Sequence, residues 1–138
     1  MALGYAALSY LAAGGNMLRL QGYLLVALFA WLAGWCVNLL LASIVREPRP
    51  HTTHPASKLL FKPLATRWKS FPSDHALSAW LIFFIACFLG LPGAWIFLPL
   101  AIWVCWGRVY AGVHYPFDVF AGFVVALAVA TVFKLYVI

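Results

Sequence analysis

The sequence predicts an all-α integral membrane helical bundle with about five hydrophobic segments. Of its 138 residues, 66% are hydrophobic and 9% are charged, and the mean hydropathy is +0.97. A soluble domain has about 45–50% apolar residues and about 25% charged residues. Apolar windows of helical length recur along the chain, and the length allows one transmembrane domain over residues 1–138. These observations exclude an ordinary soluble fold.

The apolar windows place the segments in order. Ala2–Ala13 is too short, at about 1.5 Å per residue, for a bilayer core of about 30 Å, so we expect a partial span. Residues 20–45 are uncharged and long enough to cross. Three more helices are predicted over residues 73–91, residues 94–110 and from about Tyr115 to the C-terminus, the last with Pro116 in its first turn. The three cysteines lie inside these segments, where we expect buried free thiols, at Cys36, Cys87 and Cys105.

The polar residues are concentrated in two regions. Residues 46–74 hold six of the nine Lys and Arg residues and five of the eight prolines. If residues 20–45 cross the bilayer, the next two helices return the chain to the same face at residues 108–118. The sequence therefore predicts that both polar regions converge on one membrane surface. The net charge of +6 fits anionic headgroups or a phosphorylated substrate, whereas the absence of a long basic tail argues against nucleic acid as a partner.

Three stretches on that surface carry groups suited to phosphate chemistry: "REPRP" (46–50), "PSDH" (72–75) and "GRVYAGVHYPFD" (107–118). Arginine binds two phosphate oxygens at once. Ser73 is an N-cap candidate, and a helix N-terminus binds phosphate through its free N–H groups. His114 and Asp118 have the i, i+4 spacing that lets a carboxylate fix the tautomer of an imidazole. This pattern predicts phosphoryl transfer to one histidine, with His75 as proton donor.

Simpler roles stay open for single residues. Ser73 alone could be only a helix cap, and Asp118 could serve only the helix dipole. Arg46 and Lys134 suit lipid headgroup anchors. His51 and His54 in "HTTH" could form a metal pair, but no third ligand accompanies them, so we expect a mobile loop or a substrate rim there instead.

Together, the motifs resemble the three-part signature of the type 2 phosphatidic acid phosphatase superfamily. "RP" falls on Arg49, "PSxH" on Ser73 and His75, and "R-x5-H-x3-D" on Arg108, His114 and Asp118. Within that superfamily, "EPRPH", "SFPSDHA" and "VHYPFDV" look most like the bacterial undecaprenyl-diphosphatases, which recycle a cell-wall lipid carrier.

The resemblance implies a role for each matching residue. His114 would be the nucleophile that forms a phosphohistidine, Asp118 would orient it, and His75 would protonate the leaving oxygen. The transferred phosphoryl group would be held by Arg49, Ser73 and Arg108, with no metal or other cofactor. Separately from the resemblance, we expect Asp74 to tune His75 or to position a basic neighbour such as Lys69.

The sequence departs from the superfamily pattern in three places. Ala42 stands where the first motif often begins with Lys, and Asn38 or Arg46 would compensate. Gly107 stands where Ser usually precedes the arginine. Family members usually have six spans, so we expect a core that lacks the first span.

Two other functions remain open. The motifs bind the phosphate group and not the lipid tail. A phosphatase for phosphatidate or phosphatidylglycerophosphate, or a lipid phosphotransferase, would therefore fit them equally well. A non-catalytic anion- or lipid-binding membrane protein would bind phosphate without turnover. The Lys and Arg distribution taken alone puts the site in the cytoplasm. Resemblance to the undecaprenyl-diphosphatases implies instead the outer face of a bacterial plasma membrane, and this is the location we expect.

Overall fold

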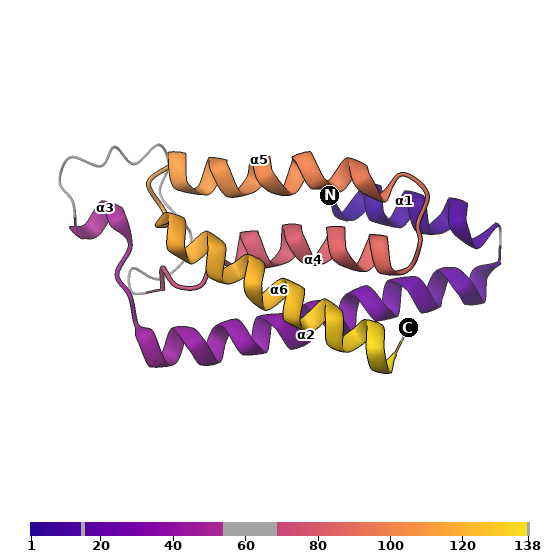
Figure 1. Cartoon of the computed structure of the whole chain (residues 1–138), viewed down its shortest axis with the longest axis horizontal. Coiled ribbons are helices and arrows are strands. Elements are labelled where there is room, and N and C mark those ends of the chain that lie inside the picture. Colours follow the sequence, from indigo (N-terminus) through magenta and orange to yellow (C-terminus); the bar gives the residue numbers. More distant parts are fainter. Residues whose placement is uncertain (15, 54–68, 138) are drawn as a thin grey trace.

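The computed structural model describes residues 1–14, 16–53 and 69–137, and this part of the chain is helical without strands (Figure 1). The predicted fold class is confirmed. The elements in chain order are α1 (Ala2–Ala13), α2 (Met17–Val45), α3 (Pro50–Thr53), α4 (Asp74–Phe88), the 3-10 helix η1 (Ala94–Ile96), α5 (Phe97–Tyr110) and α6 (Pro116–Tyr136).

Two helix boundaries and one additional helix differ from the sequence prediction. Helix α2 begins at Met17, three residues early, because Asn16 Oδ1 accepts hydrogen bonds from the backbone N–H groups of Leu18 (3.0 Å) and Arg19 (3.2 Å). Helix α4 ends at Phe88, three residues early, and Gly90 follows with a φ of 65°. The short helix α3 was not predicted. Helix α6 begins at Pro116, as predicted.

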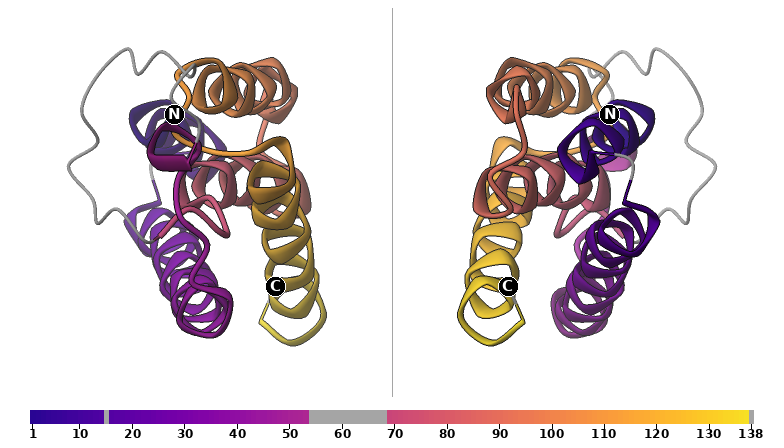
Figure 2. Two further views of the ribbon diagram at one scale, coloured as in Figure 1. Left: turned by 90° about the vertical axis from the view of Figure 1, so that its left-hand side faces the viewer. Right: turned by 90° about the vertical axis from the view of Figure 1, so that its right-hand side faces the viewer.

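Helix α4 is the centre of the bundle, and Figure 2 shows the other long helices arranged around it. Its buried side chains include Leu77, Leu81 and Ile85, which belong to the main apolar core. The facing helices contribute small residues, Ala30 from α2 and Ala126 from α6, which are fully buried. Small residues let helix backbones approach closely inside a membrane bundle.

Helices α4 and α6 approach each other closely at Gly122. A Cβ atom at this position would lie 2.7 Å from the backbone oxygen of Ser73 and 3.0 Å from Ala76 Cβ. No side chain fits that space without a shift of one helix. Gly122 therefore sets the distance between α6 and the first turn of α4.

The outer surface of the bundle is apolar. Large hydrophobic side chains such as Leu40, Trp103 and Phe120 are exposed on α2, α5 and α6. By length and composition, α2 and α6 are long and apolar enough to cross a membrane, and the other apolar helices are shorter. The prediction that all three cysteines are buried is wrong: Cys36 lies exposed on this outer surface, and Cys87 and Cys105 are only half-buried.

The two polar regions lie at the same end of the bundle, as predicted. The C-terminal ends of α2 and α5 and the N-terminal ends of α4 and α6 all lie at the left of Figure 1, together with α3. The connection between α4 and α5 and the C-terminus lie at the opposite end. Any side chains that act together on a polar ligand are therefore expected at the α3 end.

Candidate active site

Buried polar side chains gather at the α3 end of the bundle. Apart from Ser9 in α1, the buried polar or charged residues described are Asn38, Arg49, Ser70, Ser73, His114 and Asp118. Burying a polar group costs free energy unless it is hydrogen-bonded or paired. We therefore expect these six side chains at the α3 end to be hydrogen-bonded or paired, and they are here called the polar cluster.

His114 is held in a single tautomer by its contact with Ser70. The imidazole Nδ1 lies 2.8 Å from the backbone oxygen of Ser70. A carbonyl oxygen only accepts hydrogen bonds, so Nδ1 must carry the proton. In the neutral ring, the lone pair is then on Nε2. The side chain is only 4% exposed, so its orientation is fixed by its surroundings.

Asp118 supports this arrangement from the first turn of α6. Its Oδ2 accepts hydrogen bonds from the Ser70 hydroxyl at 2.5 Å and from the backbone N–H of Tyr115 at 2.8 Å. The same oxygen lies 3.5 Å from His114 Nδ1. The carboxylate is fully buried, and Oδ1 has no hydrogen-bond partner among the described residues. Asp118 thus caps its helix and also faces the histidine four residues earlier.

Ser73 joins the first turn of α4 to α6. Its hydroxyl accepts a hydrogen bond from the Ala76 N–H at 3.4 Å, and its own N–H donates to the Asp118 backbone oxygen at 3.0 Å. His75 is the second residue of the helix, and its side chain is exposed. It lies close enough to Arg108 and His114 to interact with their charges. His75 therefore stands in the helical turn that Ser73 begins, beside Arg108 and His114.

Two guanidinium groups complete the cluster. Arg49 is buried, and its Nη1 donates to the Val113 backbone oxygen at 3.2 Å. Burial lowers the pKa of Arg49, while the carboxylates of Asp118 and Asp74 oppose this shift. Arg108 interacts with the charge of Arg49, and its buried Nε has no partner among the described residues. Two neighbouring positive groups favour a shared anion.

Asp74 links two of the accessory residues. Its Oδ1 accepts a hydrogen bond from Asn38 Nδ2 at 3.0 Å, and its Oδ2 pairs with Lys69 Nζ at 2.6 Å. The expected proximity of Asp74 and Lys69 is therefore present. Asn38 lies in the same helix as Ala42, and both residues are buried. The hydrogen bond of the Asn38 side chain is to Asp74.

Arg46 is the predicted accessory residue that does not join the cluster. Its side chain is exposed, and its Nε donates to the Ser43 backbone oxygen of its own helix at 3.1 Å. The reason is local: Arg46 is the left-handed C-cap of α2, with φ 49°, which turns the side chain back over the last helical turn. No contact of Arg46 with the cluster is present among the described residues to support the idea that it compensates for a missing lysine.

His51 is the one histidine of "HTTH" that the structure describes. His51 lies in α3, and its Nδ1 is buried without a hydrogen-bond partner in the described part of the chain. His54 lies outside the described residues. At Gly107 nothing lies within 4 Å of the position that a Cβ would take, so the serine usual in the family would fit there.

Ser70 is the one member of the cluster that the sequence did not predict. It contacts both His114, through its carbonyl oxygen, and Asp118, through its hydroxyl. The Ser70 N–H in turn donates to the Glu47 backbone oxygen at 2.9 Å, which ties the residue to the region of Arg49. Only its place two residues before "PSDH" could have suggested a role.

This geometry suits a phosphorylated ligand, and a comparison with protein families agrees. The family model described as "PAP2 superfamily" matches residues 22–138. The chain belongs to the PAP2 superfamily. The predicted resemblance is therefore confirmed at the level of the family.

Several PAP2 relatives are similar in sequence. Undecaprenyl-diphosphatase BcrC of Bacillus subtilis is 32% identical over 111 residues, which is 80% of this chain and 56% of the relative. Lipid A 1-phosphatase of Rhizobium johnstonii is 38% identical over 93 residues, which is 65% of this chain and 37% of the relative. This chain thus spans about half the length of the curated relatives it matches, or less.

A solved structure shares the fold. The crystal structure of Aquifex aeolicus LpxE matches with a TM-score of 0.73 and 24% sequence identity, covering 96% of this chain and 84% of that chain. The helices of this PAP2 chain therefore have the arrangement of a known structure over nearly their whole length.

Proposed function

We propose that this chain forms the active site of a lipid phosphatase of bacterial membranes, which hydrolyses undecaprenyl diphosphate to the monophosphate and inorganic phosphate. The observation that carries the proposal is the contact between His114 Nδ1 and the Ser70 backbone oxygen. It leaves the Nε2 lone pair available for attack on phosphorus. A non-catalytic anion-binding protein would have no use for a histidine oriented in this way.

In the first step, His114 Nε2 attacks the terminal phosphorus of the diphosphate. The bond from this phosphorus to the bridging oxygen breaks, and its electron pair goes to that oxygen. Protonated His75 donates its proton to the leaving oxygen, and the lipid monophosphate departs. Arg49, Arg108 and the first turn of α4 stabilise the negative charge on the phosphoryl oxygens during transfer.

In the second step, water attacks the phosphohistidine. Neutral His75 takes a proton from the water, and the phosphorus–nitrogen bond breaks with its electron pair returning to Nε2. Inorganic phosphate leaves, and both histidines recover their starting states. Asp118 stabilises the positive charge that develops on the His114 ring when Nε2 bonds to phosphorus.

A second substrate is supported by a specific comparison. The sequence identity to lipid A 1-phosphatase is 38%, against 32% to undecaprenyl-diphosphatase BcrC, although the second match covers more of this chain. Lipid A 1-phosphate is therefore the alternative substrate of the same mechanism. We favour the undecaprenyl lipid because the BcrC match extends over 80% of this chain.

Phosphate release from purified protein tests the proposal. The substrates are undecaprenyl diphosphate, lipid A 1-phosphate and phosphatidate, each with EDTA present. We expect release from undecaprenyl diphosphate, and none from that lipid in His114→Ala. Preferred release from lipid A or phosphatidate would change the substrate. Equal rates in wild type and His114→Ala would reject the mechanism.

We further propose that the active site faces the extracytoplasmic side of the plasma membrane. Arg46 is exposed at the α3 end and outside the polar cluster, so it is a suitable reporter. An Arg46→Cys variant in a background without the native cysteines is expected to react with a membrane-impermeant maleimide in intact cells. Labelling only after the cells are opened would place the site in the cytoplasm.

A further inference from the structure

Two grooves run along the bundle beside the polar cluster. One, here called the His75 groove, has a volume of about 420 Å³ and lies between α2, α4 and α5. The other, the Pro116 groove, has a volume of about 380 Å³ and lies between α4, α5 and α6. Both volumes fall within the range of about 300–1,000 Å³ found for ligand pockets.

The His75 groove has a polar head and an apolar body. Asp74 and His75 line it at the N-terminal end of α4. Ala79 and Ile82 line it farther along, and they follow His75 by four and seven residues. This spacing puts all three on one face of α4, so the groove extends from the polar cluster for about 10 Å along the helix.

Tryptophans from α2 and a valine from α5 form the sides of this groove. Trp31 and Trp35 lie one turn apart with ring centroids 6.4 Å apart and nearly parallel rings. Trp31 Nε1 donates to the Ser78 hydroxyl at 2.9 Å, and that hydroxyl donates to the Asp74 backbone oxygen at 2.8 Å. Val104 lines the groove from α5. The two hydrogen bonds through Ser78 fix Trp31 relative to the head of the groove.

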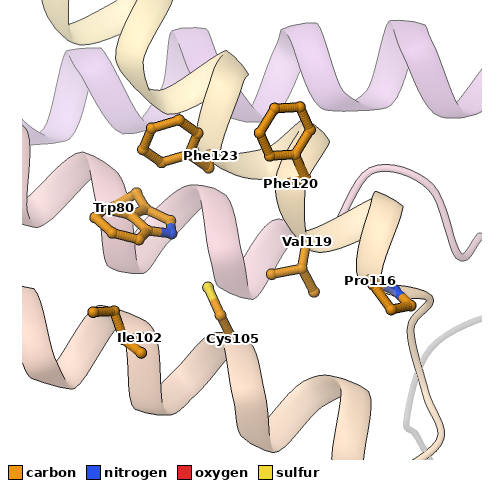
Figure 3. A pocket seen from close by; sticks show the side chains of 7 residues that line it. All are labelled: Trp80, Ile102, Cys105, Pro116, Val119, Phe120 and Phe123. Atoms are coloured by element: carbon orange, nitrogen blue, oxygen red, sulfur yellow. The ribbon is translucent and has the colours of Figure 1, made fainter.

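The Pro116 groove is apolar throughout. Figure 3 shows Trp80 of α4 and Phe123 of α6 on one side of it, with Ile102 and Cys105 of α5 on the other. Pro116 and Val119 lie at its right-hand end in the same view. These two residues come directly after Tyr115 and Asp118, so this groove lies on the side of the nucleophile and its orienting carboxylate.

The direction of phosphoryl transfer distinguishes the two grooves. The attacking and leaving atoms lie roughly in line on opposite sides of the phosphorus. With His114 as nucleophile, the leaving oxygen, which carries the lipid, is on the side of the proton donor His75. The tail must therefore start at the head of the His75 groove and not behind His114.

We propose that the His75 groove binds the first hydrocarbon units of the lipid substrate, with the rest of the tail in the bilayer. This inference rests on the proposed function for its direction of attack. The bound chain lies between the indole rings of α2 and the aliphatic side chains Ile82 and Val104. A polyprenyl chain and an acyl chain share this chemistry.

Paired substitutions on α5 test the proposal. Val104→Phe narrows the His75 groove, and Ile102→Phe, two residues away, makes the matched change in the Pro116 groove. Two substrates are compared: farnesyl diphosphate, which has a short tail, and p-nitrophenyl phosphate, which has no lipid tail. We expect Val104→Phe to raise the KM for farnesyl diphosphate about tenfold, which corresponds to an apparent affinity about tenfold lower. The same variant should change p-nitrophenyl phosphate hydrolysis much less than farnesyl diphosphate hydrolysis, and Ile102→Phe should leave both unchanged.

Three kinetic outcomes would overturn the assignment. These are an unchanged KM for farnesyl diphosphate in Val104→Phe, a raised KM in Ile102→Phe instead, and an equal loss on both substrates in Val104→Phe. A glycerol phosphate lipid with an acyl chain of similar length, assayed in parallel, distinguishes the two tail types. A larger effect of Val104→Phe on the prenyl substrate indicates that the groove binds a polyprenyl chain. A larger effect on the acyl substrate indicates that it binds an acyl chain.

Photolabelling of the unmodified protein gives an independent measurement that does not depend on the variants folding. A prenyl diphosphate carrying a diazirine on its first isoprene unit should label the α2 segment around Trp35 or the α4 segment around Ile82. Labels confined to Phe120 and Phe123 would overturn the proposal. If His114→Ala is labelled like wild type and wild type releases no phosphate, the proposed function fails while the groove assignment stands.

Discussion

The backbone oxygen of Ser70 lies 2.8 Å from Nδ1 of His114. The hydroxyl of the same serine lies 2.5 Å from Asp118 Oδ2. A single residue thus fixes the tautomer of the proposed nucleophile and holds the carboxylate that faces it. The two contacts have separate chemical origins, so substitution of the side chain removes one of them and leaves the other.

Ser70→Ala is expected to lower kcat by about 10- to 100-fold and to leave KM nearly unchanged. A hydrogen bond to a charged group contributes about 1.5–3 kcal/mol, and about 1.4 kcal/mol corresponds to a tenfold change in rate. The backbone oxygen remains, so the His114 tautomer is kept. Ser70→Thr, which keeps the hydroxyl, should recover part of the rate in steady-state assays.

Ser43→Ala is the control for this substitution. The Ser43 hydroxyl donates only to the Leu40 backbone oxygen in its own helix, as far as the described residues show, and the residue is exposed. Its rate should match wild type. If Ser70→Ala kept the wild-type kcat, the Ser70 hydroxyl would have no positioning role.

Asp118→Asn is expected to lower kcat by about 100-fold. Where an orienting carboxylate alone fixes the histidine tautomer, this change costs about 10⁴-fold. Here the Ser70 backbone oxygen also accepts the Nδ1 proton, so the tautomer survives and the loss is smaller. Single-turnover kinetics measures the chemical step directly. A loss of about 10⁴-fold would mean that the Ser70 contact does not hold the ring.

Gly122→Ala is expected to destabilise the bundle by about 1–3 kcal/mol, the usual cost of overpacking, and to reduce activity. The new Cβ would lie 2.7 Å from the Ser73 backbone oxygen, which pushes α6 away from the first turn of α4. Thermal unfolding in detergent and phosphate release measure the two effects.

Gly22→Ala is the matched control within α2. Nothing lies within 4 Å of its Cβ position, and Ala is a better helix former than Gly by about 1 kcal/mol. Its Tm should be equal to or above that of wild type, with normal activity. If both alanine variants behaved alike, the close approach at Gly122 would have no importance.

Lys69→Ala is expected to reduce kcat/KM about tenfold, mainly through KM. Its ammonium pairs with Asp74 at 2.6 Å, with side-chain exposures of 12% and 36%. Without it, the Asp74 carboxylate repels the phosphate, an effect of the size seen for partly buried charge pairs. Adding Asp74→Asn removes the repulsion, so the double variant should recover much of the loss.

Arg46→Ala separates this effect from a general loss of positive charge. Arg46 is exposed and bonds to its own helix, so its KM should stay within about twofold of wild type, as for other exposed surface charges. Equal KM increases in Lys69→Ala and Arg46→Ala would indicate long-range charge attraction in place of the Lys69–Asp74 pair.

Much of the fold follows from the sequence because apolar length and turn residues decide it. The start of α6 at Pro116 and the convergence of both polar regions at one end were predicted correctly. The start of α2 was not, because the uncharged apolar window begins only at residue 20, whereas the Asn16 side chain caps the helix and starts it at Met17.

The candidate site was predictable where side-chain chemistry carries the signal. Arg49, Ser73 and His114 stand in motifs with known spacing, and the structure brings them together. Ser70 escaped prediction because its main contact uses a backbone oxygen, which every residue has. The direction of the Arg46 side chain was not predicted either, because it depends on the left-handed C-cap conformation of this residue.

The most direct test is to identify the phosphorylated atom after rapid quenching of a reaction with undecaprenyl diphosphate. Mass spectrometry locates the residue, and the two phosphohistidine isomers differ in chromatography and NMR. We predict phosphate on Nε2 of His114, because Nδ1 donates its proton to the Ser70 backbone oxygen. Phosphate on Nδ1, phosphate on another residue, or turnover without any phosphoenzyme would contradict the account.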